Sequence, residues 1–116
     1  MATVLVMEDD DIIRGLIVRV LEMTGHRPLA YADAGPALAE VDFDEVDLIV
    51  TDLSMPTHGE EAIRRIRSRG VCAPILVVSG QLSPSKSDYL GALGAQETLE
   101  KPFSLRDLIT LVNKWT

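Results

Sequence analysis

Acidic side chains follow two short apolar runs of this sequence, at the point where each run ends. Glu8 and Asp9 come directly after residues 4–7, and Asp52 follows residues 48–51. Two further apolar runs lead into Ser79 and Lys101. Carboxylates, a hydroxyl and an ammonium group together suit a hard, oxygen-preferring cation and a phosphoryl group. These five side chains are candidate functional residues if the fold brings them together.

The apolar runs themselves indicate how this happens. They are short, rich in Val, Ile and Leu, and do not alternate with polar residues, which is typical of strands buried on both faces of a parallel sheet. Open parallel sheets bind ligands at the carboxyl ends of their strands. The pattern therefore places all five side chains at one edge of a sheet.

Stretches with helical periodicity separate the predicted strands. We expect strands over about 4–7, 28–32, 47–51, 74–78 and 98–99, and helices that begin near Asp10, Asp33, Gly59, Ser83 and Ser104. In the first helix, Ile12 and Leu16 belong to the apolar stripe that should face the sheet. Regular alternation with short connections predicts an α/β fold with a parallel sheet and helices on both faces. The periodicity does not predict the order of the strands.

Length and composition narrow the function classes. With 116 residues, the chain is predicted to form one domain over residues 1–116 and to contain no output domain. The net charge of -7 argues against direct binding to nucleic acid or to an anionic membrane. The four arginines within residues 64–69 form a helix face that we expect to be solvated. The single Cys72 excludes an internal disulfide, and without a signal peptide or long apolar span we expect a cytoplasmic protein.

The clustered carboxylates predict a metal ion. Two unit charges about 4 Å apart repel by roughly 4 kcal/mol at an effective dielectric constant near 20. Three carboxylates at one edge therefore need a neutralising cation, and Mg²⁺ has the matching preference for oxygen ligands. A zinc site is not expected, because Cys72, His26 and His58 lack ligand spacing.

Each candidate also has a structural interpretation when taken alone. The acidic residues after the first run can cap a helix, and Asp52 can be a turn residue before the loop that contains Pro56. Ser79 can bond to the backbone at a strand end, and Lys101 can be a solvated surface charge. The functional interpretation depends on the combination.

Four motifs carry a family resemblance. Val6-Met7-Glu8-Asp9-Asp10, Asp52-Leu53-Ser54-Met55-Pro56, Val78-Ser79-Gly80 and Lys101-Pro102-Phe103 resemble, in order and spacing, the motifs of two-component response-regulator receiver domains. The resemblance implies a doubly wound, flavodoxin-like sheet of five parallel strands in the order 2-1-3-4-5, with helices on both faces. It also implies a cis peptide bond before Pro102.

The resemblance further implies roles for the candidate residues. Asp52 would accept the phosphoryl group, and Glu8, Asp9 and Asp52, with the backbone carbonyl of Ser54, would bind Mg²⁺. Ser79 would be the switch hydroxyl and Lys101 the lysine that pairs with the phosphoryl group.

The implied donor is a sensor histidine kinase or a histidine phosphotransfer protein, and the implied output is an unknown downstream protein. Such a domain assists its own phosphorylation and slow dephosphorylation but is not a turnover enzyme. A monomer or a weak dimer through the face of the final helix is compatible with this assignment.

Two rival functions compete with this interpretation. A metal-dependent phosphatase that resembles the haloacid-dehalogenase family would want a second Asp two residues after the nucleophile, where this chain has Ser54. A receiver-like docking scaffold that is never phosphorylated would not need the full acidic site and Lys101.

Two departures from the family pattern stand out. Only Thr57 and His58 separate Pro56 from Gly59, where the family usually has three residues. Thr98 occupies the position of the usual aromatic switch residue, and a small β-branched side chain cannot sweep out the same volume as a ring.

Overall fold

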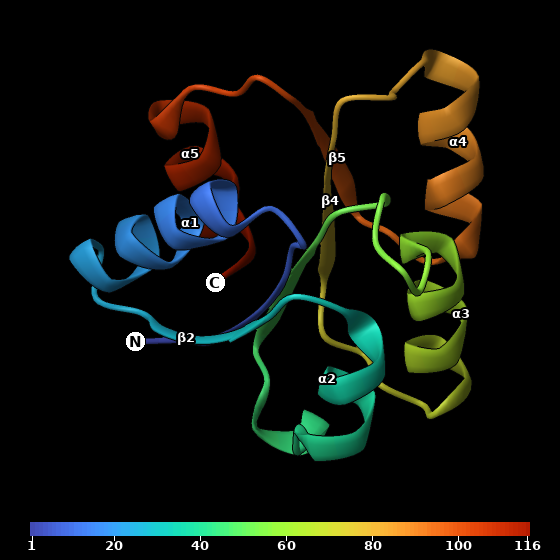
Figure 1. Cartoon of the computed structure of the whole chain (residues 1–116), viewed down its shortest axis with the longest axis horizontal. Helices are drawn as coiled ribbons and strands as arrows, with labels where there is room; N and C mark the ends of the chain where they lie inside the picture. The colour runs from blue at the N-terminus through green and yellow to red at the C-terminus, as the bar shows by residue number, and fades with distance from the viewer.

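Strands and helices alternate along the whole chain, as the sequence predicts (Figure 1). The computed structural model describes all residues 1–116. The elements are β1 (Thr3–Met7), α1 (Asp11–Met23), β2 (Arg27–Tyr31), α2 (Ala34–Glu40), the short 3-10 helix η1 (Phe43–Glu45), β3 (Leu48–Thr51), α3 (Gly59–Ser68), β4 (Ile75–Ser79), α4 (Pro84–Leu93), β5 (Glu97–Glu100) and α5 (Leu105–Trp115). None of the helices has the length and apolar character needed to cross a membrane.

The five strands form one parallel sheet in the order β2-β1-β3-β4-β5. This order confirms the doubly wound, flavodoxin-like fold. The register sets Met7 opposite Thr51 and Ser79 opposite Glu100. Consequently the residues that follow these positions, Glu8, Asp52 and Lys101, leave the sheet at the same edge.

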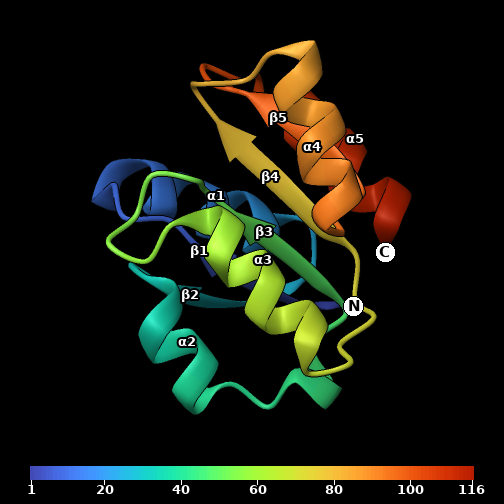
Figure 2. The ribbon, with the colours of Figure 1, turned by 90° about the vertical axis from the view of Figure 1, so that its right-hand side faces the viewer.

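The helices cover both faces of the sheet. On one face α2, α3 and α4 enclose a core that includes Leu5, Ile49, Ile63, Ile66 and Leu90. On the other face α1 and α5 pack over a second core (Figures 1 and 2), which includes Val4, Val50, Leu76, Leu108 and Val112. Because both faces are covered, the three central strands β1, β3 and β4 have no polar alternation, and their polar side chains gather at the carboxyl ends.

Side-chain caps begin four of the helices where the sequence predicts. Asp10, Asp33, Ser83 and Ser104 each adopt an extended backbone and accept a hydrogen bond from the first turn of α1, α2, α4 and α5, respectively. In contrast, α3 begins after His58 without a side-chain cap. The start of α3 is therefore set by the loop that precedes it.

Two residues of the predicted apolar stripe of α1 do not face the sheet. Ile12 is 84% exposed and Leu16 is 40% exposed, although both belong to the predicted apolar stripe. Only Ile17, Val20 and Leu21 of this helix are buried. The reason is the orientation of the helix: Ile12 and Leu16 lie on the same face of α1 as the exposed Arg19 and Met23. The neighbouring face, which includes Ile13 and Ile17, packs against the sheet.

Candidate functional site

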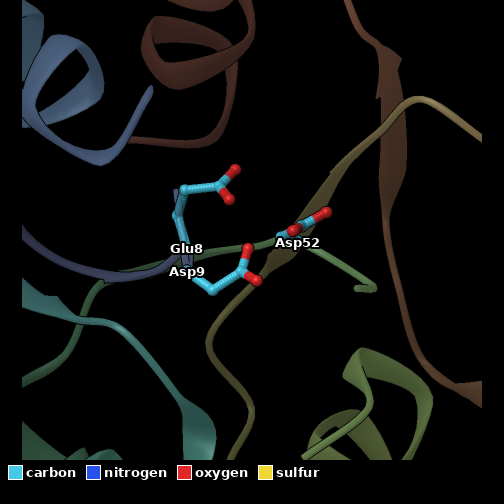
Figure 3. A group of neighbouring side chains, drawn as sticks. All are labelled: Glu8, Asp9 and Asp52. Carbon is cyan, nitrogen blue, oxygen red and sulfur yellow. The ribbon is translucent and has the colours of Figure 1, made fainter. Parts of the chain in front are cut away.

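The sheet brings together the three carboxylates predicted from the sequence. Glu8 and Asp9 follow β1, and Asp52 follows the neighbouring strand β3 (Figure 3). One oxygen from each of the three side chains lies within 4.8 Å of the other two. Glu8 and Asp52 are buried, at 1% and 5% exposure, whereas Asp9 is exposed. The cluster is thus open to solvent on the side of Asp9.

Backbone hydrogen bonds hold this cluster in place. The Asp52 amide donates to the carbonyl of Met7 at 2.9 Å, and the Leu53 amide donates to Asp52 Oδ1 at 2.8 Å. The Asp10 amide donates to Glu8 Oε2 at 3.2 Å. The sheet register and these local bonds orient the two buried carboxylates.

Lys101 follows β5, the edge strand opposite β2, and its side chain reaches the same cluster. Its Nζ lies 2.6 Å from Glu8 Oε1 and 3.5 Å from Asp52 Oδ1. The Lys101 amide donates to the carbonyl of Ser79 at 2.8 Å, and the following bond to Pro102 is cis, as expected. The ammonium group therefore faces both buried carboxylates.

Burial shifts the pKa of the two partners in this pair. Burial raises the pKa of Glu8 to about 7, with a further contribution from the charge of Asp52 and opposition from Lys101 and the Asp10 amide. For Lys101, burial alone would lower the pKa, but the bond to Glu8 and the charge of Asp52 outweigh it and raise the pKa. Lys101 is accordingly an ammonium ion at neutral pH, and it does not neutralise the cluster completely.

The donor set fits a hard divalent cation. All three clustered side chains offer carboxylate oxygens, and burial raises the pKa of Glu8 although Lys101 lies beside it. Mg²⁺ prefers oxygen ligands, binds through one or two carboxylates and keeps several waters. The exposed Asp9 leaves this side of the cluster accessible to water.

Ser79, expected at the sheet edge, and Ser54, implied by the family resemblance, lie in different surroundings. Ser79 ends β4 with 1% exposure, and its Oγ accepts a hydrogen bond from the Gln81 amide at 3.1 Å. Ser54 is exposed in the loop after Asp52. A hollow of about 460 Å³ opens beside these loops, and its lining includes Ser54, His58, Glu60, Gln81 and Lys86.

At the position of the usual aromatic residue, Thr98 forms a polar contact with α4. Its Oγ1 lies 3.2 Å from Ser87 Oγ, and the Thr98 side chain is half-buried. A small hydroxyl pair thus joins β5 to α4 where the family usually has a ring. The usual movement of a ring cannot occur at this position.

Sequence reasoning missed the residues that shape the loop after Asp52. Asp33, at the end of β2, accepts hydrogen bonds from both the amide and the hydroxyl of Thr57. Gly59 packs so closely that a Cβ there would lie 2.3 Å from the Asp52 carbonyl oxygen. The capping signal at Asp33 is visible in the sequence, but the contact to Thr57 is not, because 24 residues separate the two.

Curated relatives match most of this chain. A probable transcriptional regulatory protein of Picosynechococcus is 35% identical over 93% of the chain and 46% of its own length. The DNA-binding transcriptional regulator NtrC of Azospirillum brasilense is 33% identical over 97% of the chain and 24% of its own length. The chain therefore spans less than half the length of these relatives.

Solved structures share the entire fold. The chemotaxis protein CheY4 of Vibrio cholerae superposes with a TM-score of 0.92 at 30% identity, covering 100% of this chain and 99% of its own. The receiver domain of the Francisella response regulator 1452 also gives a TM-score of 0.92, at 28% identity over 99% of this chain and 96% of its own. The family model of the response regulator receiver domain matches residues 4–113. This chain belongs to the response regulator receiver domain family of two-component systems.

Proposed function

We propose that residues 1–116 act as a Mg²⁺-dependent phosphoacceptor domain, with Asp52 as the residue that is phosphorylated. The observation that carries the proposal is the position of the Asp52 carboxylate, which is buried, grouped with Glu8 and Asp9, and 3.5 Å from the ammonium of Lys101. A structural turn aspartate needs none of these neighbours.

In the proposed transfer, an Asp52 carboxylate oxygen attacks the phosphorus of a phosphohistidine on the donor protein. The new O–P bond gives an acyl phosphate, and the P–N bond breaks with its electron pair left on the imidazole. Lys101 and the Leu53 amide offer positive charge and a hydrogen bond on the Asp52 side of the reaction. Positioning and electrostatics dominate this class of transfer.

We assign the metal to Glu8, Asp9, Asp52 and the backbone carbonyl of Ser54. Mg²⁺ bound there supplies positive charge that offsets the charge on the transferring oxygens. The carboxylates hold this position in advance, because Glu8 and Asp52 are fixed by backbone amides and Lys101.

The proposed switch begins at Ser79 and Lys101. The Ser79 hydroxyl accepts a bond from the Gln81 amide, which leaves its own proton available for a phosphoryl oxygen. Lys101 can exchange its contact with Glu8 for one with the phosphoryl group. Both movements alter the loops after β4 and β5 and thus the adjoining surface, which a downstream protein would recognise. In this role the domain resets by hydrolysis of its own acyl phosphate and does not turn over an external substrate.

An exposed apolar surface beside the acidic edge supports a protein as the phosphoryl donor. Ile12 and Leu16 are exposed on α1, and a hollow of about 330 Å³ lies between α1 and the segment from Lys101 to Phe103. Exposed apolar groups that gather next to a functional edge are typical of protein-interaction sites. A sensor histidine kinase or histidine phosphotransfer protein would dock here, in the cytoplasm.

The test is the intact mass of the protein after incubation with acetyl phosphate, with and without Mg²⁺. We expect a gain of one phosphoryl group that requires Mg²⁺ and disappears in Asp52→Asn. Asp107→Asn, in the exposed first turn of α5, serves as the matched control and should label normally. Equal labelling of Asp52→Asn and the wild type would contradict the assignment of Asp52.

The donor surface has a separate test. Ile12→Asp should slow transfer from a phosphorylated kinase or phosphotransfer domain and leave labelling by acetyl phosphate unchanged. The exposed Met23, at the far end of the same helix, gives the matched variant Met23→Asp. Equal kinase-dependent rates for both variants would place the donor surface elsewhere.

A further inference from the structure

We propose that Asp33 and Thr57 are positioning residues for the metal and phosphoryl site, through the loop that carries Ser54. This inference rests on the proposed function of Asp52 and its neighbours. Neither residue belongs to the acidic cluster. Their effect on the site would pass through the backbone of residues 53–58.

The contact between them joins two separate parts of the sheet edge. Asp33 follows β2, the edge strand, and Thr57 lies in the loop between β3 and α3. Asp33 Oδ1 accepts the Thr57 amide at 2.7 Å, and Oδ2 accepts the Thr57 hydroxyl at 2.8 Å. Oδ2 also accepts the Gly35 amide at 3.0 Å, which is the cap of α2. One carboxylate therefore serves as helix cap and as loop anchor.

Other contacts fix the rest of the loop. The side chains of Leu53 and Met55 are both buried at 5% exposure. The Gly59 amide closes the loop on the Leu53 carbonyl at 2.9 Å. Gly59 itself lies against the Asp52 backbone, since an added Cβ would be 2.3 Å from the Asp52 carbonyl oxygen. Ser54 thus lies between fixed points, and the bond from Thr57 to Asp33 fixes the distal part of the loop.

The anchor is charge-assisted. Burial raises the pKa of Asp33, but the bonds from Thr57 and Gly35 outweigh it and hold the pKa below its ordinary value. Hydrogen bonds to an ionised carboxylate are about twice as strong as neutral ones. Only two residues separate Pro56 from Gly59, so the loop has few alternative conformations. Loss of the Thr57 hydrogen bonds would therefore shift the backbone at Ser54.

Groups that hydrogen-bond to metal ligands orient them without touching the metal, and their loss commonly weakens metal affinity by about tenfold or more. The contact of Asp33 with Thr57 would act one step further out, on Ser54 through the loop backbone. We therefore expect Asp33→Ser to raise the Mg²⁺ dissociation constant by about tenfold. Serine retains the ability to cap α2 but is too short to reach Thr57. Thr57→Val keeps the hydrogen bond from the backbone amide and loses the one from the hydroxyl, so it should have a smaller effect. Thr57→Ser keeps both hydrogen bonds and should retain the wild-type Mg²⁺ affinity.

The experiment measures three quantities for each variant: Mg²⁺ affinity by calorimetry, the initial rate of phosphorylation by acetyl phosphate, and the free energy of unfolding without Mg²⁺. The matched control is Asp42→Ser, because Asp42 caps η1 through the Asp44 amide and makes no hydrogen bond to the loop. A cap-only role would change stability in both variants and leave Mg²⁺ affinity unchanged.

The expected result is weaker Mg²⁺ binding and slower labelling in Asp33→Ser, with neither change in Asp42→Ser or Thr57→Ser. Wild-type Mg²⁺ affinity in Asp33→Ser would overturn the inference, even if phosphorylation of the wild type confirms the proposed function. A wild-type protein that binds Mg²⁺ but gains no phosphoryl group would contradict the proposed function alone. A wild-type protein that binds no Mg²⁺ would overturn both.

Discussion

At the scale of single residues, the site combines two buried carboxylates with one ammonium group. Glu8 lies 2.6 Å from Lys101, and Asp52 lies 3.5 Å from the same nitrogen. Asp9 adds a third carboxylate within 4.8 Å. The cluster therefore carries excess negative charge when all of its acidic groups are ionised, and this excess should appear in the pH dependence of stability.

Without metal, the ionisation of Glu8 should destabilise the fold. The pKa of Glu8 in the folded protein is about 7, above its ordinary value of 4.5, so the folded state binds this proton more tightly. The resulting stabilisation is full below the ordinary value and is lost as the pH rises through 7. The size of the shift sets the size of the effect. As the pH rises from 4.5 to 8, the free energy of unfolding of Glu8→Gln should increase relative to that of the wild type by up to about 3 kcal/mol.

Urea unfolding in EDTA at about pH 5 and about pH 8 measures this effect. The control is Glu45→Gln, which makes the same change at an exposed position outside the site. An equal difference between Glu8→Gln and wild type at both pH values would show that burial does not raise the pKa of Glu8.

Single residues also mark the boundary of what sequence reasoning can predict. Glu8, Asp9, Asp52 and Lys101 could be placed together because the carboxyl ends of parallel strands share one edge. Their chemical roles stay a proposal. The contact of Asp33 with Thr57 could not be predicted, because it depends on the path of a loop and no periodic pattern describes that path.

At the scale of elements, one arginine holds the end of α3 to the connections before β4 and β5. The Arg67 guanidinium donates to the carbonyls of Val71, Ala73 and Gly94 at 2.7, 2.8 and 2.7 Å. The sequence pattern predicts that the arginines of α3 form a solvated face, and this is wrong for Arg67, which is half-buried. Helical spacing indicates the side of a helix but not what the neighbouring loops place there.

Arg67→Lys should therefore destabilise the fold. Lysine cannot reproduce the planar fork of donors, and each lost bond to a charged donor is worth about 1.5–3 kcal/mol. We expect a net loss of about 2 kcal/mol after partial compensation. Arg65→Lys, on the exposed face with Glu61 as its ion-pair partner, should change stability by less than about 0.5 kcal/mol. Chemical denaturation of both variants measures their free energies of unfolding, and equal values would contradict the bridging role of Arg67.

Replacement of glycine by alanine should increase stability in two helices and decrease it in a third. An added Cβ at Gly15 in α1 or at Gly91 in α4 would meet no atom within 4 Å, so each alanine should stabilise its helix by about 0.5–1 kcal/mol. Gly59→Ala should destabilise the protein by about 1–3 kcal/mol, because the new methyl group meets the Asp52 backbone. Thermal unfolding of the three variants provides the comparison, and wild-type stability in Gly59→Ala would show that the loop is free to move.

The elements themselves were largely predictable. The buried strands and the caps Asp10, Asp33, Ser83 and Ser104 lie where their local patterns indicate, because those patterns express local energetics. Strand order came from the family resemblance and not from periodicity. The exposure of Ile12 could not be foreseen, since the apolar residues of α1 cover more than one helix face and the pattern does not show which of these faces meets the sheet.

At the scale of the whole molecule, the two hydrophobic cores stabilise the fold, and the carboxyl edge of the sheet holds the candidate site. The cores on the two faces of the sheet carry the packing, and the polar edge carries excess charge that a ligand can relieve. The chain spans less than half the length of its curated relatives from Picosynechococcus and Azospirillum brasilense.

Metal binding at the edge should stabilise the entire fold. A ligand at about one hundred times its dissociation constant adds about 2.7 kcal/mol to the free energy of unfolding. We expect Mg²⁺ to raise the midpoint of thermal unfolding in mildly alkaline buffer, and Asp9→Asn to reduce this increase without a comparable loss in EDTA. A Mg²⁺ effect of the same size in Asp9→Asn would place the ion elsewhere.

The most direct test of the central claim is to identify the phosphorylated residue chemically. Borohydride reduction of the acetyl phosphate-treated protein converts an aspartyl phosphate to homoserine, and peptide mass spectrometry locates the change. We predict a single Mg²⁺-dependent conversion at Asp52. A conversion at Asp9, at another acidic residue or at none, in a protein that binds Mg²⁺, would contradict the account.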